Sequence, residues 1–438
     1  MEIGVTDLST PVVGFVGMSH LGLVSSTAAA LRGFPTVAFD PSPDLISRLS
    51  LGDLPVLEPG LDEAVARAAE KLSFTSDPEQ LATCDIVYIS IDVPTDATGT
   101  SDLSPIRVAV DLARAHVHST AAIIVLSQVT PGFTREVDWP SALTYYQVET
   151  LVFGQALQRA MEPERLIVGM ADAKGTAHPA FWHFLESFGC PIHVMGYESA
   201  ELAKVAVNAM LVATISAANT MAEICERIGA DWTEIVPALR LDRRIGDFSY
   251  IHAGLGLTGG NLERDVQTII RLAQENGTDQ SVPRAWVESS VRRRNWVHDA
   301  LVRIAGEETR ELAVGNWGLA YKENTDSTKN SVSVNLIRNL GTASCRWFDP
   351  VVNGENLNLP GQKAASALEA ASGADVLCVM TPWGEFSAVS AQAIVDAMRG
   401  NWVIDPWGRL DPDAMSAVGA RHLVLGRSAE SRGKGSPC

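Results

Sequence analysis

The chain has 438 residues, more than one ordinary hydrophobic core supports, and this length predicts two or three domains. Hydrophobic residues make up 46% and charged residues 20% of the chain, the balance of a folded globular protein. The formal net charge of -18 argues against a nucleic-acid partner, because neutralising phosphates requires clustered Lys and Arg.

Cysteine usage and hydropathy indicate the compartment of the protein and whether it binds a metal or a membrane. The six cysteines form no CxxC pair and show no metal-ligand spacing to His, so we expect reduced thiols and no metal site. The first residues lack a basic segment followed by a long apolar stretch, and no uncharged apolar run reaches about 18 residues. We therefore expect a cytoplasmic protein without a membrane partner.

The first third of the chain shows the pattern of an α/β domain. Residues 12–16 are a short apolar run that ends in a glycine turn, and residues 21–31 follow at helical spacing. Further strands are predicted at 36–40, 86–91, 123–126 and 165–168. Strands that alternate with helices predict a parallel, doubly wound sheet.

A long helix is predicted at 199–228, because this segment is rich in Ala, free of Gly and Pro, and followed by Gly229. A helix of about 30 residues is about 45 Å long, enough to bridge two domains and to offer a dimerisation face. The chain stays largely helical to about residue 305, apart from a Gly-rich loop at 253–260.

A second α/β pattern begins near residue 311, with strands predicted at 312–315, 345–348, 376–380 and 402–404. The expected fold class is therefore α/β, with two Rossmann-like, doubly wound domains joined by a long central helix. The predicted parts are an N-terminal domain at 1–196, a central helical and dimerisation region at 197–305, a C-terminal α/β domain at 306–427 and a flexible tail at 428–438.

The first glycine turn reads Gly17-Met18-Ser19-His20-Leu21-Gly22. In a dinucleotide-binding fold, the first glycine permits a tight turn and the last lets the helix pack on the strand. The middle position, which lets the backbone approach a pyrophosphate, holds Ser19, so the motif is imperfect. Asp40 ends the second strand, where a carboxylate binds ribose hydroxyls and favours NAD over NADP. An α/β domain with an ordinary turn is the alternative.

Polar residues on the long helix form the next signal. Glu201, Lys204 and Asn208 are spaced by three and four residues, so they share one face of the helix. A solvated ion pair between Glu201 and Lys204 is the structural interpretation. The functional alternative is that Lys204, among apolar neighbours, polarises a substrate oxygen as the oxygen gains charge.

The Gly-rich loop ends at Asn261 and is followed by Asp265. Glycines at this density indicate backbone that closely approaches a ligand, and Asp265 could act as a general base through a water. A flexible linker is the alternative. The preceding segment 242–246 supplies Arg side chains suited to phosphate or sugar oxygens.

Taken in order, these motifs resemble the nucleotide-sugar 6-dehydrogenases of the UDP-glucose and UDP-N-acetylmannosamine type, over nearly the whole chain. The segments that carry the resemblance are 54–61, 93–95, 127–132, Glu149, 201–208, 242–246 and 318–326. The resemblance implies NAD bound by the N-terminal domain, a UDP-sugar bound by the C-terminal domain, and a homodimer.

In that family, NAD oxidises the C6 alcohol of the sugar to an aldehyde. A cysteine then attacks, a second hydride leaves, and the thioester is hydrolysed to a uronic acid. The resemblance gives the oxyanion contacts to Lys204 and Asn208, proton handling to Asp265 with a water, and thioester hydrolysis to Glu149. Counted back from Asp265, the cysteine position holds Asn261, whose delocalised amide cannot replace a thiolate.

The resemblance also implies the wider binding sites. We expect cofactor contacts from Gly17, Ser19, His20, Leu21, Gly22, Asp40, Val93, Gln128, Arg264 and Lys329. We expect substrate contacts from Glu149, Lys204, Asn208, Arg244, Tyr250, Gly254, Gly256 and Lys322. Several cofactor positions depart from the family's residues, namely Val93, Gln128, Arg264 and Lys329.

Three functions are compatible with this set of residues. The first is a single hydride transfer that stops at the aldehyde or runs in reverse, because Lys204, Asn208 and Asp265 are retained. The second is oxidation to the acid through an aldehyde hydrate, and the third is a non-catalytic relative that binds nucleotide sugars. A hydroxyacid dehydrogenase with the same Rossmann-and-long-helix plan is a looser alternative, against which residues 318–326 argue.

Overall fold

The computed structural model describes residues 10–96, 101–306, 312–341 and 344–428. It divides into two compact units, Met1–Val207 and Asn208–Cys438, which are treated separately below. The start of the chain at 1–9 and the predicted tail from residue 429 onward lie outside the described residues.

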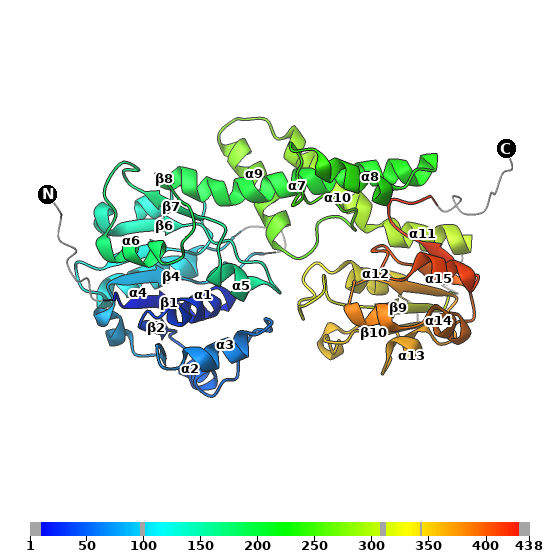
Figure 1. Cartoon of the computed structure of the whole chain (residues 1–438), viewed down its shortest axis with the longest axis horizontal. Coiled ribbons are helices and arrows are strands. Elements are labelled where there is room, and N and C mark those ends of the chain that lie inside the picture. Colours follow the sequence, from blue (N-terminus) through cyan, green and yellow to red (C-terminus); the bar gives the residue numbers. More distant parts are fainter. Residues whose placement is uncertain (1–9, 97–100, 307–311, 342–343, 429–438) are drawn as a thin grey trace. The chain divides into compact units, whose positions relative to one another are not determined.

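The first unit contains an eight-stranded sheet in the order β3-β2-β1-β4-β5-β6-β7-β8 (Figure 1). Its strands are β1 Val13–Val16, β2 Thr36–Phe39, β3 Leu72–Thr75, β4 Ile86–Ile89, β5 Ala122–Val125, β6 Thr144–Gln147, β7 Leu166–Met170 and β8 Ile192–Gly196. The first six are parallel and follow the order of a dinucleotide-binding sheet.

The prediction of a parallel sheet is wrong at one position, because β7 runs antiparallel to β6. For β7 to run parallel to β6, the chain would have to cross back to the end of the sheet at which β6 begins. The segment between these strands instead enters β7 opposite the carboxyl end of β6, with Tyr146 paired to Gly169. Strand β8 is then parallel to β7.

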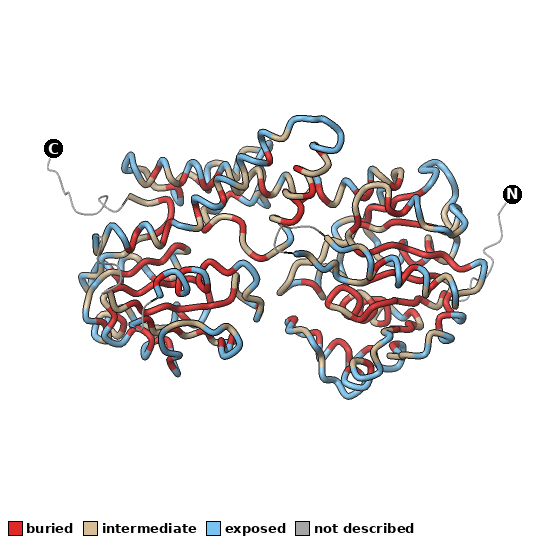
Figure 2. Tube along the Cα trace, turned by 180° about the vertical axis from the view of Figure 1, so that it is seen from behind, coloured by how far each residue is buried: buried red, intermediate tan, exposed pale blue. Residues whose placement is uncertain are grey.

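Helices cover both faces of this sheet. They are α1 His20–Leu31, α2 Pro43–Ser50, α3 Leu61–Ala68, α4 Ser104–His116, α5 Ala156–Met161 and α6 Pro179–Glu186, with short 3-10 turns η1 Pro78–Thr83, η2 Thr134–Glu136 and η3 Ser141–Leu143. Side chains alternate between the faces, so Phe15 and Tyr88 lie in one hydrophobic cluster while Val16 and Ile89 lie in another. Figure 2 shows the strands as buried.

The long helix α7 runs from Tyr197 to Ile228 and confirms the predicted central helix, with a start two residues earlier. It is followed by α8 Trp232–Leu241, α9 Asn261–Glu275, α10 Ser281–Arg294 and α11 Trp296–Ala305. By length and composition alone α7 could cross a membrane, a test that core helices of soluble proteins also pass.

The second unit contains a parallel six-stranded sheet in the order β11-β10-β9-β12-β13-β14, which repeats the order of the first six strands. Its strands are β9 Val314–Trp317, β10 Cys345–Phe348, β11 Gln362–Lys363, β12 Val376–Val379, β13 Trp402–Ile404 and β14 Arg421–Leu423. Its helices are α12 Val332–Leu340, α13 Ala367–Ala371, α14 Ala391–Ala397 and α15 Pro412–Ala417, with short turns η5 Glu355–Leu357 and η6 Gly384–Ala388. The predicted fold class is therefore confirmed.

The first strand of this sheet lies two residues later than the predicted segment 312–315. The predicted segment ends before Asn316, and polar residues are less common in buried strands. Asn316 is nevertheless buried within β9, and its amide donates to Gly318 O and to Ser333 Oγ, both at 3.0 Å. These bonds satisfy the buried amide and allow the strand to continue.

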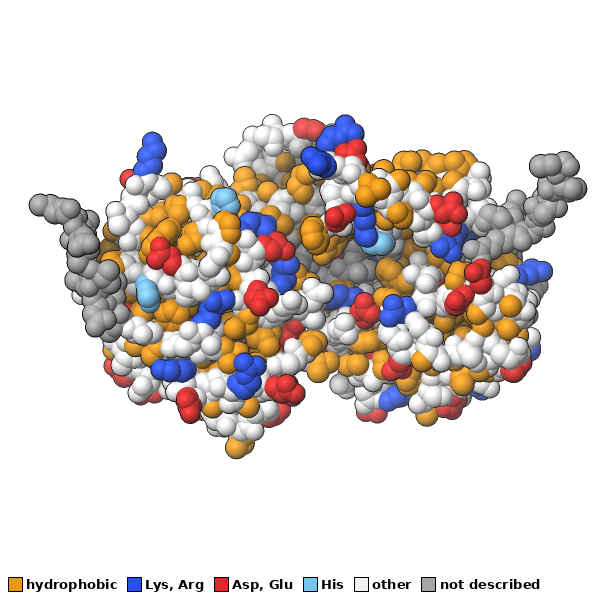
Figure 3. All heavy atoms as spheres, in the orientation of Figure 1, with side chains coloured by type: hydrophobic (Ala, Val, Ile, Leu, Met, Phe, Trp, Pro, Cys, Tyr) orange, Lys and Arg blue, Asp and Glu red, His pale blue; other side chains and the backbone are white. Residues whose placement is uncertain are grey.

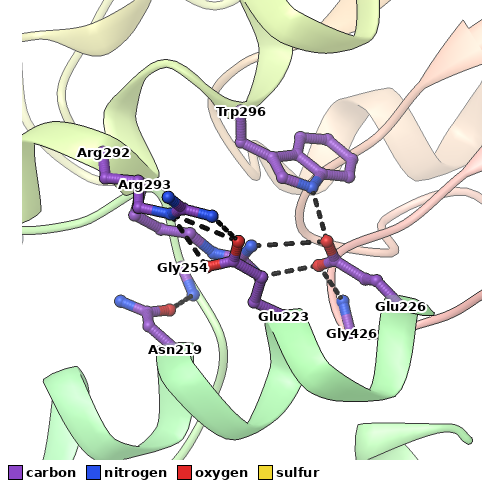
Figure 4. A network of polar contacts seen from close by, with 8 residues as sticks. All are labelled: Asn219, Glu223, Glu226, Gly254, Arg292, Arg293, Trp296 and Gly426. Atoms are coloured by element: carbon purple, nitrogen blue, oxygen red, sulfur yellow. Dashed lines mark hydrogen bonds and ion pairs between the residues drawn. The ribbon is translucent and has the colours of Figure 1, made fainter. Parts of the chain in front are cut away.

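A polar network ties the end of α7 to the rest of the second unit (Figure 4). The carboxylate of Glu226 accepts from Arg293 at 2.7 Å, from Trp296 Nε1 at 2.9 Å and from the backbone N–H of Gly426 at 2.8 Å. Arg293 is 4% exposed, so this is a buried ion pair. Glu223, one turn earlier, pairs with the exposed Arg292.

We predict that Glu226→Ala lowers the free energy of unfolding by about 3–5 kcal/mol, because it leaves the Arg293 guanidinium buried without its partner. Glu223→Ala is the matched control, and it should cost at most about 1 kcal/mol because the Arg292 pair is exposed. Urea titration followed by tryptophan fluorescence measures both values. Equal losses for the two variants would contradict the distinction.

Candidate active site

The glycine turn of the first unit has the close contacts of a dinucleotide-binding turn. Gly17 lies at φ +99°, and a Cβ there would lie 2.4 Å from Ile91 Cγ1. A Cβ on Gly22 would lie 1.8 Å from the carbonyl oxygen of Gly17. Both positions therefore require glycine, and they bring α1 against the end of β1 as the fingerprint predicts.

The residues around this turn fit NAD. The Asp40 carboxylate accepts from Met18 N at 2.9 Å and from Ser42 N at 3.0 Å, and each oxygen keeps a further lone pair for a ribose hydroxyl. Ser19 is the N-cap of α1, yet its side chain makes no capping hydrogen bond, and the first turn contains no acidic residue. Helix N-termini favour anions, so α1 is suited to the diphosphate of NAD, although the Leu21 N–H of this turn also donates to Asp92.

Ser19 and Asp92 connect the turn to the end of β4. The Ser19 hydroxyl donates to Ser90 O at 3.3 Å and accepts from Asp92 N at 3.0 Å. The Asp92 carboxylate in turn accepts from Leu21 N at 3.3 Å. Sequence reasoning selected the next residue, Val93, and missed Asp92, because nothing in the strand pattern showed that its side chain turns back to α1.

The first unit also brings together two predicted catalytic residues. Lys204 Nζ donates to Glu149 O at 2.9 Å and to Glu149 Oε2 at 3.1 Å, and both side chains are largely buried. Arg159 of α5 holds the segment after Glu149, since its Nε donates to Thr150 O at 2.8 Å. The lysine and the carboxylate thus form one preorganised pair.

The predicted ion pair between Glu201 and Lys204 is wrong. Glu201 is fully buried and accepts backbone N–H groups from Gly132 at 2.6 Å and Thr134 at 2.8 Å. Burial raises the pKa of Glu201, and the two N–H donors partly offset that rise. The carboxylate therefore anchors the loop after β5, which contains Gln128, rather than neutralising Lys204.

The second unit brings Asn208 together with Asp265. The Asn208 amide donates to Asp265 Oδ2, and Arg264 Nε donates to Asp265 Oδ1 at 3.1 Å. All three residues are buried. Arg264, expected at the cofactor, thus forms a buried ion pair with the predicted base.

The Gly-rich loop is ordered by helices rather than being a flexible linker. Gly254 N donates to Asn219 Oδ1 on α7 at 2.8 Å, and Leu257 N donates to Ser290 Oγ on α10 at 2.8 Å. Gly256 lies at φ +76° against the same Ser290. Asn219 and Ser290 were missed by sequence reasoning, because an isolated polar residue within a helix carries no motif.

Asn261, which was expected to stand at the family's nucleophile position, is exposed and is the first residue of α9. Glu263 pairs with Arg294 and accepts from the Asn330 amide at 2.5 Å. Lys329, which was expected at the cofactor, packs against Gly260. A Cβ added to Gly260 would lie 2.8 Å from Lys329 Cε.

None of the cysteines in the described part of the chain offers a substitute thiolate. Burial raises the pKa of Cys84 and of Cys345 to about 12, and it also raises the pKa values of Cys190, Cys225 and Cys378. These thiols stay protonated at neutral pH and are poor nucleophiles.

The remaining predicted substrate residues are accessible. Arg244 is exposed and pairs with Asp242 at 2.6 Å, and Tyr250 is exposed in the same loop. Lys322 Nζ lies 5.7 Å from the ring centroid of Tyr321. Across the described ranges, no group of three or more His, Cys, Asp or Glu side chains is placed to hold a metal ion.

Three models of the UDP-glucose/GDP-mannose dehydrogenase family match the chain in order. The NAD binding domain matches residues 12–180, the central domain 198–291 and the UDP binding domain 315–412.

Curated relatives match at nearly full length. The chain is 27% identical to the UDP-glucose 6-dehydrogenase TuaD of Bacillus subtilis, over 95% of this chain and 93% of that protein. It is 28% identical to a UDP-glucose 6-dehydrogenase of Rhizobium meliloti, over 95% of this chain and 99% of the relative.

A solved UDP-glucose dehydrogenase from the archaeon Pyrobaculum islandicum superposes with a TM-score of 0.81 at 25% identity, over 97% of this chain and 100% of that chain. The NAD binding match contains the glycine turn and Asp40, so the cofactor is NAD and the protein is an NAD-dependent oxidoreductase. The chain belongs to the UDP-glucose/GDP-mannose dehydrogenase family.

Proposed function

We propose that this protein oxidises the C6 alcohol of a UDP-hexose with NAD in one hydride transfer and releases the aldehyde. The observation that carries the proposal is the residue set around α9. Asn261 stands at the nucleophile position, whereas Asn208 and Asp265 remain paired. The groups needed for the first oxidation are retained, and the thiolate needed to hold the aldehyde is replaced by an amide.

The first step uses the chain's own residues as follows. The Lys204 ammonium has three N–H donors, and two of them donate to Glu149. The third is available to the alcohol oxygen of the substrate as that oxygen gains negative charge. The Asn208 amide also keeps a second N–H beside the one given to Asp265. Asp265, which Arg264 Nε contacts at 3.1 Å, accepts the hydroxyl proton through a water. NAD, when bound, accepts the hydride from C6.

Two other outcomes compete with this one. An aldehyde hydrate could lose a second hydride directly and yield the uronic acid. A binding protein without turnover is the third outcome. It is disfavoured because a pure binder has no need of Lys204, Asn208 and Asp265 together.

We predict that the protein with excess NAD and UDP-glucose forms one NADH per sugar consumed, together with an aldehyde that hydroxylamine traps. Absorbance at the NADH band and mass spectrometry of the sugar nucleotide measure the two quantities. Two NADH per sugar would contradict a single oxidation, while binding without NADH would contradict both enzymatic outcomes. UDP-N-acetylmannosamine, tested in parallel, reports the choice of sugar.

We predict that Asn261→Cys introduces uronic-acid formation, because it restores a thiol at the start of α9, where the helix dipole favours the thiolate. The NADH yield should rise from one to two per sugar. Asn261→Ala is the matched control, since it removes the amide without adding a nucleophile, and its yield should stay at one. An unchanged product from the cysteine variant would indicate that α9 presents position 261 differently.

We also propose that the protein is a homodimer that acts without a nucleic-acid or membrane partner. Hydrophobic side chains gather on the surface of α7 and α8 (Figure 3). In this region Phe248 is 96% exposed and Leu241 is 83% exposed, and Met210 and Ile228 are also exposed. Exposed large apolar side chains on these helices and on the loop that follows α8 favour a protein interface.

The homodimer predicts a mass of two chains in solution by light scattering. Replacing Leu241 and Phe248 with Asp should shift that mass to one chain, because the charges would be buried at the interface. Leu51→Asp is the matched control, since Leu51 is 86% exposed in the first unit, and this variant should stay dimeric. A single-chain mass for the unmodified protein would overturn the proposal.

A further inference from the structure

Glu58 is a buried acid in the first unit that the reaction above does not use. Its side chain is 1% exposed and lies in the loop between α2 and α3. Three donors surround it, since Ala156 N donates at 2.7 Å, Gly154 N at 3.0 Å and His20 Nε2 at 3.1 Å. A carboxylate is costly to bury, and these donors are what hold it there.

His20 connects Glu58 to the glycine turn. It is the first residue of α1 and belongs to the fingerprint, and its side chain is buried. The ring stacks on Phe153 with centroids 4.2 Å apart and an interplanar angle of 21°. His20 was expected to contact the cofactor, and its side chain instead contacts Phe153 and Glu58.

The other two donors to Glu58 belong to the segment that follows Glu149. Gly154 and Ala156 end this segment, and Glu149 begins it. Lys204 holds the first residue through two hydrogen bonds. A continuous series of contacts therefore runs from the first turn of α1 through His20 and Glu58 to the Glu149–Lys204 pair.

We propose that His20 and Glu58 are positioning residues that couple NAD binding at the glycine turn to the placement of Glu149 against Lys204. A diphosphate bound to the N–H groups of the first turn of α1 restrains that turn. His20 lies on the same turn, so its ring is then held against Phe153 and Glu58. The restrained Glu58 carboxylate keeps the amides of Gly154 and Ala156 in place, and this order extends to Glu149.

The coupling itself requires only NAD binding. Its consequence for catalysis, the placement of Glu149, rests on the proposed function. A measurement on the protein with NAD and without sugar therefore distinguishes a failure of the coupling from a failure of the proposed reaction.

The test is hydrogen exchange with and without saturating NAD, read by mass spectrometry on peptides that cover 149–156. In the unmodified protein, NAD should slow exchange of the Gly154 and Ala156 amides by about tenfold, because local opening of the segment becomes rarer. His20→Phe keeps the stack on Phe153 and removes the bond to Glu58. In this variant the NAD-dependent slowing should largely disappear, although NAD still binds.

Two further variants make the test specific. His20→Gln retains an N–H donor toward Glu58 and should restore most of the slowing, whereas Glu58→Gln should lose most of it. His116→Phe is the matched control, because it removes the surface contact between His116 and Glu79. That variant should behave like the unmodified protein.

The proposed coupling would be overturned if NAD does not slow amide exchange in the unmodified protein. It would also be overturned if His20→Phe and Glu58→Gln keep the full NAD-dependent slowing. If His20→Phe does not fold, the comparison of Glu58→Gln with the unmodified protein decides. A protein that shows the slowing with NAD but no turnover of any sugar would retain the coupling and lose the proposed reaction.

Discussion

Buried carboxylates that accept backbone N–H groups hold the loops that carry the chemistry of this protein. Glu201 on α7 binds the loop after β5 through Gly132 and Thr134, and Glu58 binds the segment after Glu149. Each carboxylate replaces hydration with two or more directed bonds, so it is stable only when the loop takes one conformation. The loops are thereby held in place without being part of the sheet.

In both Rossmann-like sheets, an aspartate that follows the second strand accepts backbone N–H groups, but the two aspartates differ in how many donors they bind. In the first unit, Asp40 accepts one N–H on each carboxylate oxygen. In the second unit, the corresponding Asp349 accepts five donors, namely Leu319 N, Ala320 N, Trp383 Nε1, Val351 N and Val352 N. A carboxylate has about four lone-pair sites, so Asp349 is saturated and Asp40 is not. This difference fits the match of the NAD binding domain to the first half of the chain.

The sequence was sufficient for those features that depend on local pattern. Short apolar runs predicted five of the eight strands of the first sheet and four of the six strands of the second. The Gly-free, Ala-rich segment predicted α7 within two residues. Features that depend on distant partners were missed. Glu201 is spaced correctly for an ion pair with Lys204, yet Gly132 and Thr134 compete for it from a loop far away in sequence. Likewise the direction of β7 depends on where the chain re-enters the sheet, and the hydrophobic periodicity of the sequence does not show this.

Lys204 and Asn208 are one helical turn apart on α7, and the boundary between the two compact units falls between Val207 and Asn208. An insertion or deletion of one residue between them would rotate the downstream part of the helix by about 100° relative to the upstream part. Lys204 and Asn208 would then no longer share a face of the helix. Natural variation in length should accordingly accumulate in the loops of either half, while the stretch of α7 from 204 to 208 keeps a constant number of residues.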